Sequence, residues 1–244
     1  MINPAEPSIN ASIVDLDALV LSRAIHAREL SCREVMQAYL AQIERCNPLV
    51  NALVSLGDPE ALLEQADERD RQLAQGQSMG WMHGMPQAIK DLAATAGMTT
   101  SMGSPLFAEH VPQGDAISVA RVRASGAIIV GKSNVPEFGL GSHTYNQLFG
   151  TTGNAYDSTL CAGGSSGGAA VALALRMLPV ADGSDDGLVA QPRSLQQRVR
   201  HAPLPGPGAV RPDSGTVRAA VGHRRSHGAH GGRRGAAVGY PGRV

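Results

Sequence analysis

Three short apolar runs, each ending in small or polar residues, constrain the fold of this chain most strongly. They are PQAIKDL, AIIVGKSN and LPVADGSD, which begin at residues 86, 127 and 178. The helical segment DAISVARVRAS precedes the second run, and a Gly/Ser-rich loop with the helical segment AAVALALR precedes the third. Strands that alternate with helices predict an α/β fold, a mixed sheet flanked by helices, in which ligands usually bind beyond the carboxyl ends of the strands.

An N-terminal helical segment comes before these strands. Across residues 13–46, apolar residues recur at three- and four-residue intervals with charges between them, which is typical of an amphipathic helix. Ser31 and Glu34 resemble a capping box that starts a new helix at SCREVMQAYLAQIER. A further helix is predicted over Pro59–Gln75, closed by Gly76.

The charge balance divides the chain near Asp185. Residues 1–185 hold 11 Lys and Arg against 19 Asp and Glu, whereas residues 186–244 hold ten Arg, no Lys and two Asp. The first part is therefore acidic and the second basic, although the net charge of the whole chain is zero. All apolar periodicity stops in the second part, which is rich in Arg, Gly, Pro and Ala. We expect residues 1–185 to be the N-terminal part of one α/β domain and residues 186–244 to be a disordered tail.

The first candidate for chemistry is Lys90, in the segment GMPQAIKD at residues 84–91. The chain has only two lysines, and this one directly follows an apolar strand that should be buried. Desolvation lowers the pKa of a lysine, and a neutral lysine can act as a base. The plainer interpretation is an ion pair with Asp91 or another acid at a strand end. Lys132, in GKSN, is interpreted as structural, because the glycine spacing of a phosphate-binding loop is absent.

The second candidate is the loop CAGGSSGGAA, which begins at Cys161. Two glycine pairs bracket Ser165 and Ser166, and glycine suits a tight loop where main chain approaches a substrate. A flexible linker or a phosphate-cradling loop would have the same composition. On its own the loop leaves these alternatives open.

Taken together, these residues resemble the amidase signature family. The matching segments are GMPQAIKD at 84–91, GKSNVPEFGLGS at 131–142, FGTTGN at 149–154, GGSSGGAAVALA at 163–174 and VADGSD at 180–185. The resemblance covers about residues 15–185 and implies a hydrolase that cleaves carboxamide C–N bonds to a carboxylate and ammonia or an amine.

The resemblance also implies a Ser–cisSer–Lys triad without a metal or organic cofactor. Lys90 matches the lysine that takes a proton, and Ser165 matches the middle serine, which follows a cis peptide bond after Gly164 and relays that proton. The implied active-site loop also contains Gly163, Gly164, Ser166, Gly167, Gly168 and Asp185.

The nucleophilic serine that the family implies is missing. After Asp185 the expected x-Gly-Gly-Ser is replaced by Asp186-Gly187-Leu188-Val189; Ser184 comes too early and Ser194 too late. Shifting the reading frame by one nucleotide from Asp186 allows Gly-Ser-Leu-Arg-Asn-Pro, the continuation expected of the family. The same shift over Ser226–Val238 allows a second segment similar to the family. We therefore infer a frameshift after Asp185, and we expect the chain as written to be inactive.

Other functions remain open at this stage. Within the family, the chain could be a fragment of the A subunit of a glutamine-dependent tRNA amidotransferase, and from another class it could be a non-catalytic remnant with a basic tail. The arginines of the tail are scattered and aromatic residues nearly absent, which disfavours a nucleic-acid partner. We expect a small-molecule amide substrate and a homodimer for the intact family member.

Composition points to a cytoplasmic protein. Three scattered cysteines form neither a disulfide framework nor a CxxC metal motif. The first residues lack the basic start and apolar run of a signal peptide, and no apolar stretch is long enough for a transmembrane helix. No membrane partner is therefore expected.

Overall fold

A small mixed sheet forms the centre of the molecule. The structure, a computed structural model, describes residues 13–184 and the strand 216–220. Its main sheet has the order β1-β3-β2, with β1 at Leu53–Val54, β3 at Ile128–Ser133 and β2 at Pro86–Lys90. Strand β2 is parallel to β3, and β1 is antiparallel to it. This arrangement confirms the predicted α/β class with a mixed sheet.

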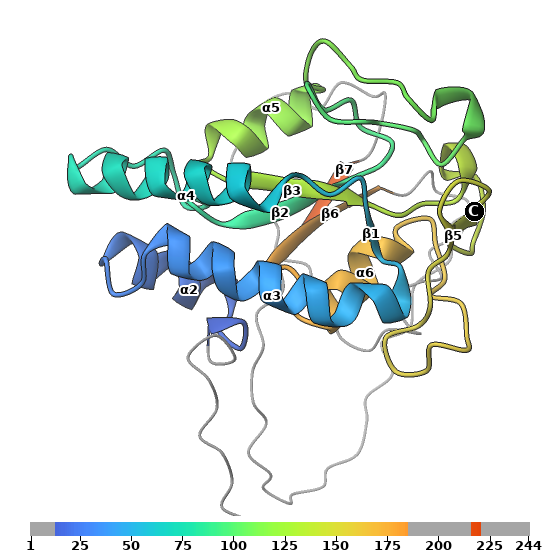
Figure 1. Ribbon diagram of the computed structural model, residues 1–244, viewed down its shortest axis with the longest axis horizontal. Coiled ribbons are helices and arrows are strands. Elements are labelled where there is room, and N and C mark those ends of the chain that lie inside the picture. The colour runs from blue at the N-terminus through green and yellow to red at the C-terminus, as the bar shows by residue number, and fades with distance from the viewer. Residues whose placement is uncertain (1–12, 185–215, 221–244) are drawn as a thin grey trace, which may run out of the picture.

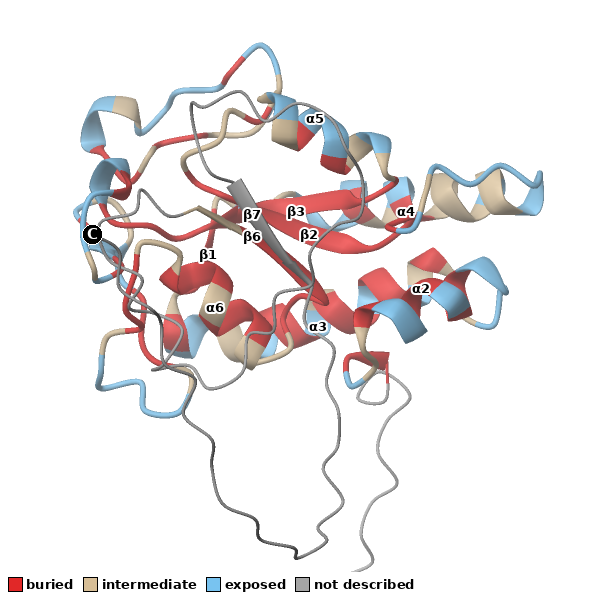
Figure 2. Cartoon of the chain, turned by 180° about the vertical axis from the view of Figure 1, so that it is seen from behind, coloured by how far each residue is buried: buried red, intermediate tan, exposed pale blue. Residues whose placement is uncertain are grey.

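Helices cover both faces of the sheet. They are α2 (Ala18–His26), α3 (Cys32–Val50), α4 (Pro59–Ala74), α5 (Ile117–Ala124) and α6 (Gly167–Ala174). In the two opposite views α3 and α6 lie on one side of the strands and α5 on the other (Figures 1 and 2). No helix within the described residues is both long and apolar enough to cross a membrane.

The predicted capping box at Ser31 is confirmed. The Glu34 N–H donates to Ser31 Oγ at 3.1 Å, and the Ser31 N–H donates to Glu34 Oε2 at 2.9 Å. These bonds satisfy N–H groups that the first turn of a helix leaves unpaired. Helix α3 continues beyond the predicted Arg45, with Pro48 inside it, and ends at Val50. Asn51, which follows, caps the helix with a left-handed φ of 51°.

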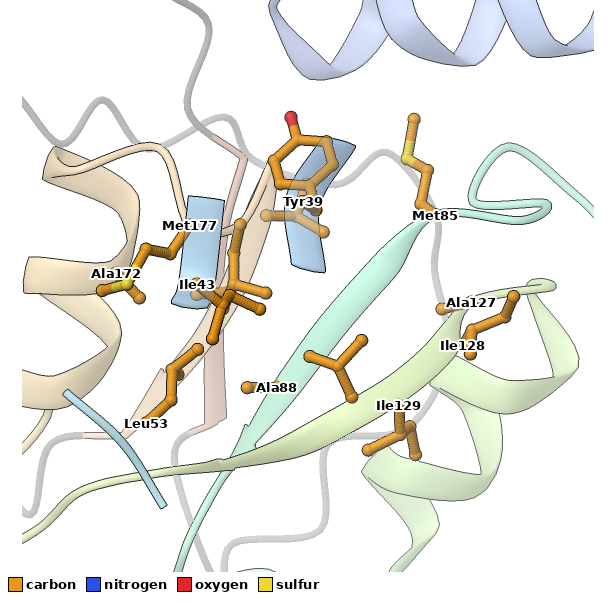
Figure 3. Close-up of a cluster of buried hydrophobic side chains, with 14 of the residues drawn as sticks. Tyr39, Ile43, Leu53, Met85, Ala88, Ala127, Ile128, Ile129, Ala172 and Met177 are labelled. Carbon is orange, nitrogen blue, oxygen red and sulfur yellow. The ribbon is translucent and has the colours of Figure 1, made fainter. Parts of the chain in front are cut away.

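The core lies where α3 and α6 pack against the sheet. Figure 3 shows side chains from α3, from the strands β1, β2 and β3 and the residues next to them, and from α6 and the turn that follows it, in one cluster. Its labelled members are Tyr39, Ile43, Leu53, Met85, Ala88, Ala127, Ile128, Ile129, Ala172 and Met177. Both faces of β2 and β3 are buried (Figure 2), which explains why these strands are continuous apolar runs.

Long connections with short elements lie beyond the carboxyl ends of β2 and β3. They contain two 3₁₀ turns, Pro105–Phe107 and Glu137–Gly139, and the two-residue strands β4 (Tyr145–Asn146) and β5 (Gly150–Thr151), which pair with each other. The second connection leads into α6.

Strand β6 (Val180–Ser184) carries a partner that the sequence did not predict. It pairs antiparallel with β7 (Thr216–Ala220), from Val180 opposite Ala220 to Ser184 opposite Thr216. The structure thus describes residues 216–220 of the 186–244 tail as a strand. The rest of the tail lies outside the described residues, and its disorder stays a prediction. An open strand edge offers N–H and C=O groups to any extended segment, so β7 needs no apolar pattern of its own.

Candidate active site

Lys90 is the centre of the candidate site. It is the last residue of β2 and is only 2% exposed. Its Nζ donates to Ser165 Oγ at 2.8 Å, to Ser184 Oγ at 2.9 Å and to Ser184 O at 3.0 Å. Because β2 is parallel to β3 and precedes a loop, the amine lies beyond the carboxyl ends of the strands, where ligands bind in such sheets.

The backbone of Lys90 is fixed by Asp182. The Lys90 N–H donates to Asp182 Oδ1 at 2.9 Å, and this bond joins the end of β2 to β6. Burial raises the pKa of the Asp182 carboxyl, while the bond from the Lys90 N–H acts in the opposite direction. The Asp182 carboxyl group therefore accepts a hydrogen bond from a buried backbone N–H.

Ser165 lies in a loop whose glycines are required by close packing. The peptide bond between Gly164 and Ser165 is cis, as the resemblance implies. A Cβ on Gly167 would overlap Thr144 Oγ1, and one on Gly168 would overlap the backbone nitrogen of Asn134. These approaches leave no room for a side chain.

Thr144, which lies in another segment of the chain, forms hydrogen bonds with two residues of the same loop. Its Oγ1 donates to Gly163 O at 2.7 Å and accepts from the Gly167 N–H at 3.1 Å. Gly163 has a φ of +77°, a conformation that favours glycine. The loop for which the sequence allowed either a linker or an active-site loop is thus a tightly held turn before α6.

Ser166 supports the backbone of Ser184. Its Oγ donates to Ser184 O at 3.2 Å and accepts from the Ser184 N–H at 3.3 Å. The adjacent serines of the loop therefore differ in role: Ser165 contacts the amine of Lys90, and Ser166 fixes the end of β6.

Lys132 has the structural role that the sequence predicted. It is fully buried, and its Nζ donates to Ala93 O at 2.7 Å and to Thr95 Oγ1 and Thr100 Oγ1, both at 2.9 Å. Asp91 lies 3.8 Å from the same nitrogen. Burial lowers the pKa of Lys132 to about 8. The lysine holds together the connection that follows β2.

The structure brings together Lys90, Ser165 and the loop residues Gly163, Gly164, Ser166, Gly167 and Gly168, all expected from the sequence. Asp185, also expected there, lies outside the described residues. Sequence reasoning missed Asp182 and the contact of Ser184 with Lys90. Both stand on β6, and only the proximity of β6 to the end of β2 reveals them. Within residues 13–184, no cluster of three His, Cys, Asp or Glu side chains could hold a metal ion.

A comparison with known protein families shows to which family this chain belongs. The family described as Amidase matches residues 34–192, most of the chain. The chain belongs to the amidase family. The sequence resemblance is therefore confirmed, and the match ends shortly past Asp185.

Curated relatives belong to amidotransferases. The A subunit of the glutamyl-tRNA(Gln) amidotransferase from Alkaliphilus metalliredigens is 38% identical over 175 residues, which cover 72% of this chain and 35% of that protein. The protein of the same name from Azoarcus sp. is 37% identical over 209 residues, covering 86% of this chain and 40% of that one. The amidase-family chain thus spans little more than a third of the length of these relatives.

Solved structures of amide hydrolases share the fold. A fatty acid amide hydrolase matches with a TM-score of 0.70 and 25% identity over 74% of this chain and 32% of its own. A bacterial aryl acylamidase of the amidase signature family matches with a TM-score of 0.68 and 29% identity over 72% of this chain and 36% of its own. The amidase-signature fold is therefore present in the described part of this amidase-family chain.

Proposed function

We propose that this chain carries the lysine–serine half of an active site that hydrolyses a carboxamide C–N bond to a carboxylate and ammonia or an amine. One observation supports this most directly: Lys90 Nζ lies 2.8 Å from Ser165 Oγ. A general base must lie within hydrogen-bond reach of the proton it takes. In the proposed mechanism, neutral Lys90 takes a proton from Ser165, which in turn takes one from the nucleophilic serine.

The same proposal holds that the chain as written does not turn over amides. The nucleophile is expected within residues 186–189, where the sequence is Asp-Gly-Leu-Val. Without a nucleophile the acyl-enzyme route is lost, and the remaining members of a triad do not replace it. We attribute the loss to a frameshift after Asp185.

Two experiments test this proposal. Determination of the nucleotide sequence around codons 185–190, with the frame followed past codon 244, should show a long open frame that continues through Gly-Ser-Leu-Arg-Asn-Pro. Expression of that restored frame should give a longer protein that releases ammonia from simple carboxamides, while the chain as written releases none. Steady hydrolysis by the chain as written that is abolished by Ser165→Ala, or stop codons throughout the alternative frame, would contradict the proposal.

A second candidate is the A subunit of a glutamine-dependent tRNA amidotransferase. The names and identities of the curated relatives favour it. Such a protein would release ammonia from glutamine and would need partner subunits to use it. Ammonia release from glutamine but not from simple carboxamides by the restored protein would favour this candidate, and the reverse preference would favour a free-standing amidase. A restored protein inactive on both would indicate a non-catalytic remnant.

The proposal extends to a cytoplasmic location and, for the intact protein, a homodimer acting on a small amide. Light scattering of the restored protein would measure its mass in solution. A monomer would remove the dimer from the proposal without affecting the chemistry.

A further inference from the structure

Ser184 is held against Lys90 as closely as Ser165 is. Its Oγ lies 2.9 Å from Lys90 Nζ, and its carbonyl oxygen lies 3.0 Å from the same nitrogen. It is the last residue of β6 and is partly exposed. A hydroxyl that contacts a buried amine and belongs to a partly exposed residue has two features that favour a nucleophile.

The backbone around this hydroxyl is held by Ser166. Ser166 Oγ bonds both the N–H and the carbonyl of Ser184, at 3.3 and 3.2 Å. The preceding residue is Gly183, where an added Cβ would lie only 3.2 Å from Ser166 Oγ. The position of the Ser184 side chain relative to Lys90 is therefore set by the surrounding residues before any reagent arrives, which lowers the entropic cost of reaction.

We propose that Ser184 is a reactive serine that forms a covalent adduct with phosphoryl fluorides and activated acyl compounds, with Lys90 as its base. In the step with a phosphoryl fluoride, the Ser184 oxygen attacks phosphorus and a new O–P bond forms. The P–F bond breaks, fluoride leaves with its electron pair, and the hydroxyl proton passes to the neutral amine of Lys90. A serine hydroxyl is a weak nucleophile without such a base.

The reaction stops at one adduct per chain. Fluoride leaves without help, whereas a carboxamide needs oxyanion donors and protonation of its nitrogen. The proposal shares with the proposed function the role of Lys90 as base, but it concerns a single modification at Ser184 and does not depend on amide turnover.

The experiment uses the full chain with diisopropyl fluorophosphate. Mass spectrometry of the intact protein should show one adduct, and peptide mapping should place it on Ser184. Lys90→Met should slow the labelling about 10²-fold or more, the usual effect of removing a general base, and Ser184→Ala should abolish it. Ser158→Ala, at an exposed serine of the loop between β5 and α6, should label like the parent chain.

The peptide map of the parent chain shows which serine carries the adduct, and it tests the proposal even if a variant fails to fold. An adduct on Ser165 in place of Ser184 would overturn the proposal, and so would the absence of any adduct. Labelling of Ser184 at an equal rate in the Lys90→Met chain would also overturn it, because the reaction would then not use the amine.

Discussion

The backbone N–H of Lys90 donates a hydrogen bond to the side chain of Asp182 at 2.9 Å, across 92 residues of sequence. This bond fixes the end of β2 against β6, and the amine of the same lysine reaches two hydroxyls from that position. Lys90 is thus held through its main chain as well as through its side chain.

Asp182→Ala should destabilise the chain more than Asp182→Asn. Alanine removes the side-chain oxygen to which the buried Lys90 N–H donates, and loss of a partner by a buried polar group costs about 1–3 kcal/mol, whereas asparagine keeps an oxygen in place. Urea unfolding followed by circular dichroism measures the difference. Equal stability of the two variants would mean that the bond to Lys90 contributes nothing.

Lys132 should make the chain more stable as the pH rises from about 8 to 10.5. Burial lowers its pKa from 10.5 to about 8, so in this window the unfolded chain binds more protons than the folded one. The free energy of unfolding then increases with pH. The measurement is the pH dependence of urea unfolding for the parent chain minus that for Lys132→Met.

The subtraction removes other groups that titrate in the same range. Burial raises the pKa of Cys32 and of Tyr39, which lowers stability at high pH in both proteins equally. A difference curve that is flat from pH 8 to 10.5 would contradict the prediction for Lys132.

Gly168→Ala should destabilise the chain by about 1–3 kcal/mol, the usual cost of overpacking. The added Cβ would overlap the backbone nitrogen of Asn134 and would lie 2.5 Å from the carbonyl oxygen of Ala52. Gly114→Ala is the matched control, because no atom lies within 4 Å of its added Cβ. Thermal unfolding should separate the two variants, and similar melting temperatures would show that the backbone at Gly168 adjusts easily.

In the frame-restored protein, Lys90→Met should lower kcat/KM for a carboxamide about 10²- to 10⁴-fold, as expected for loss of a general base. Lys132→Met serves as a comparison, because that amine bonds Ala93, Thr95 and Thr100 in the connection after β2. The Lys132→Met substitution should change the free energy of unfolding and not kcat/KM. A restored enzyme that tolerates Lys90→Met would rule out Lys90 as the base.

Trypsin should cut the chain first within residues 186–215 and later at Arg218. The composition of the tail predicts accessible arginines such as Arg193, whereas Arg218 lies in β7, opposite Asp182 in the β6 ladder. Mass spectrometry of timed digests gives the order of cleavage. Cutting at Arg218 as fast as at Arg193 would argue against the pairing of β6 with β7 in solution.

The sequence predicted the lysine–serine pair because both residues stand in distinctive motifs. GMPQAIKD places Lys90 at a strand end, and GGSSGG places Ser165 before a helix. The resemblance to the amidase signature family then implied that the two residues belong to one site. Apolar runs likewise located β2, β3 and β6 to within two residues, because strands buried on both faces are continuously apolar.

The contribution of β6 could not be predicted in the same way. Asp182 and Ser184 meet Lys90 only because β6 lies beside the end of β2, and the order of strands in space is not encoded in any local pattern. Strand β7 escaped prediction for a related reason: its pairing is determined by the available edge of β6 and not by its own sequence.

The bonds that hold Lys90 to Ser165, Ser184 and Asp182 all come from residues that precede Asp185. A change of sequence after that position therefore leaves the residues that bond Lys90 in place, although it can alter the strand β7 that pairs with β6. Selection acting on the fold alone would keep the Lys90 amine in contact with both hydroxyls, with or without catalysis. Under the proposed frameshift, a single reverse step in the gene would act on a chain in which these residues are already folded together.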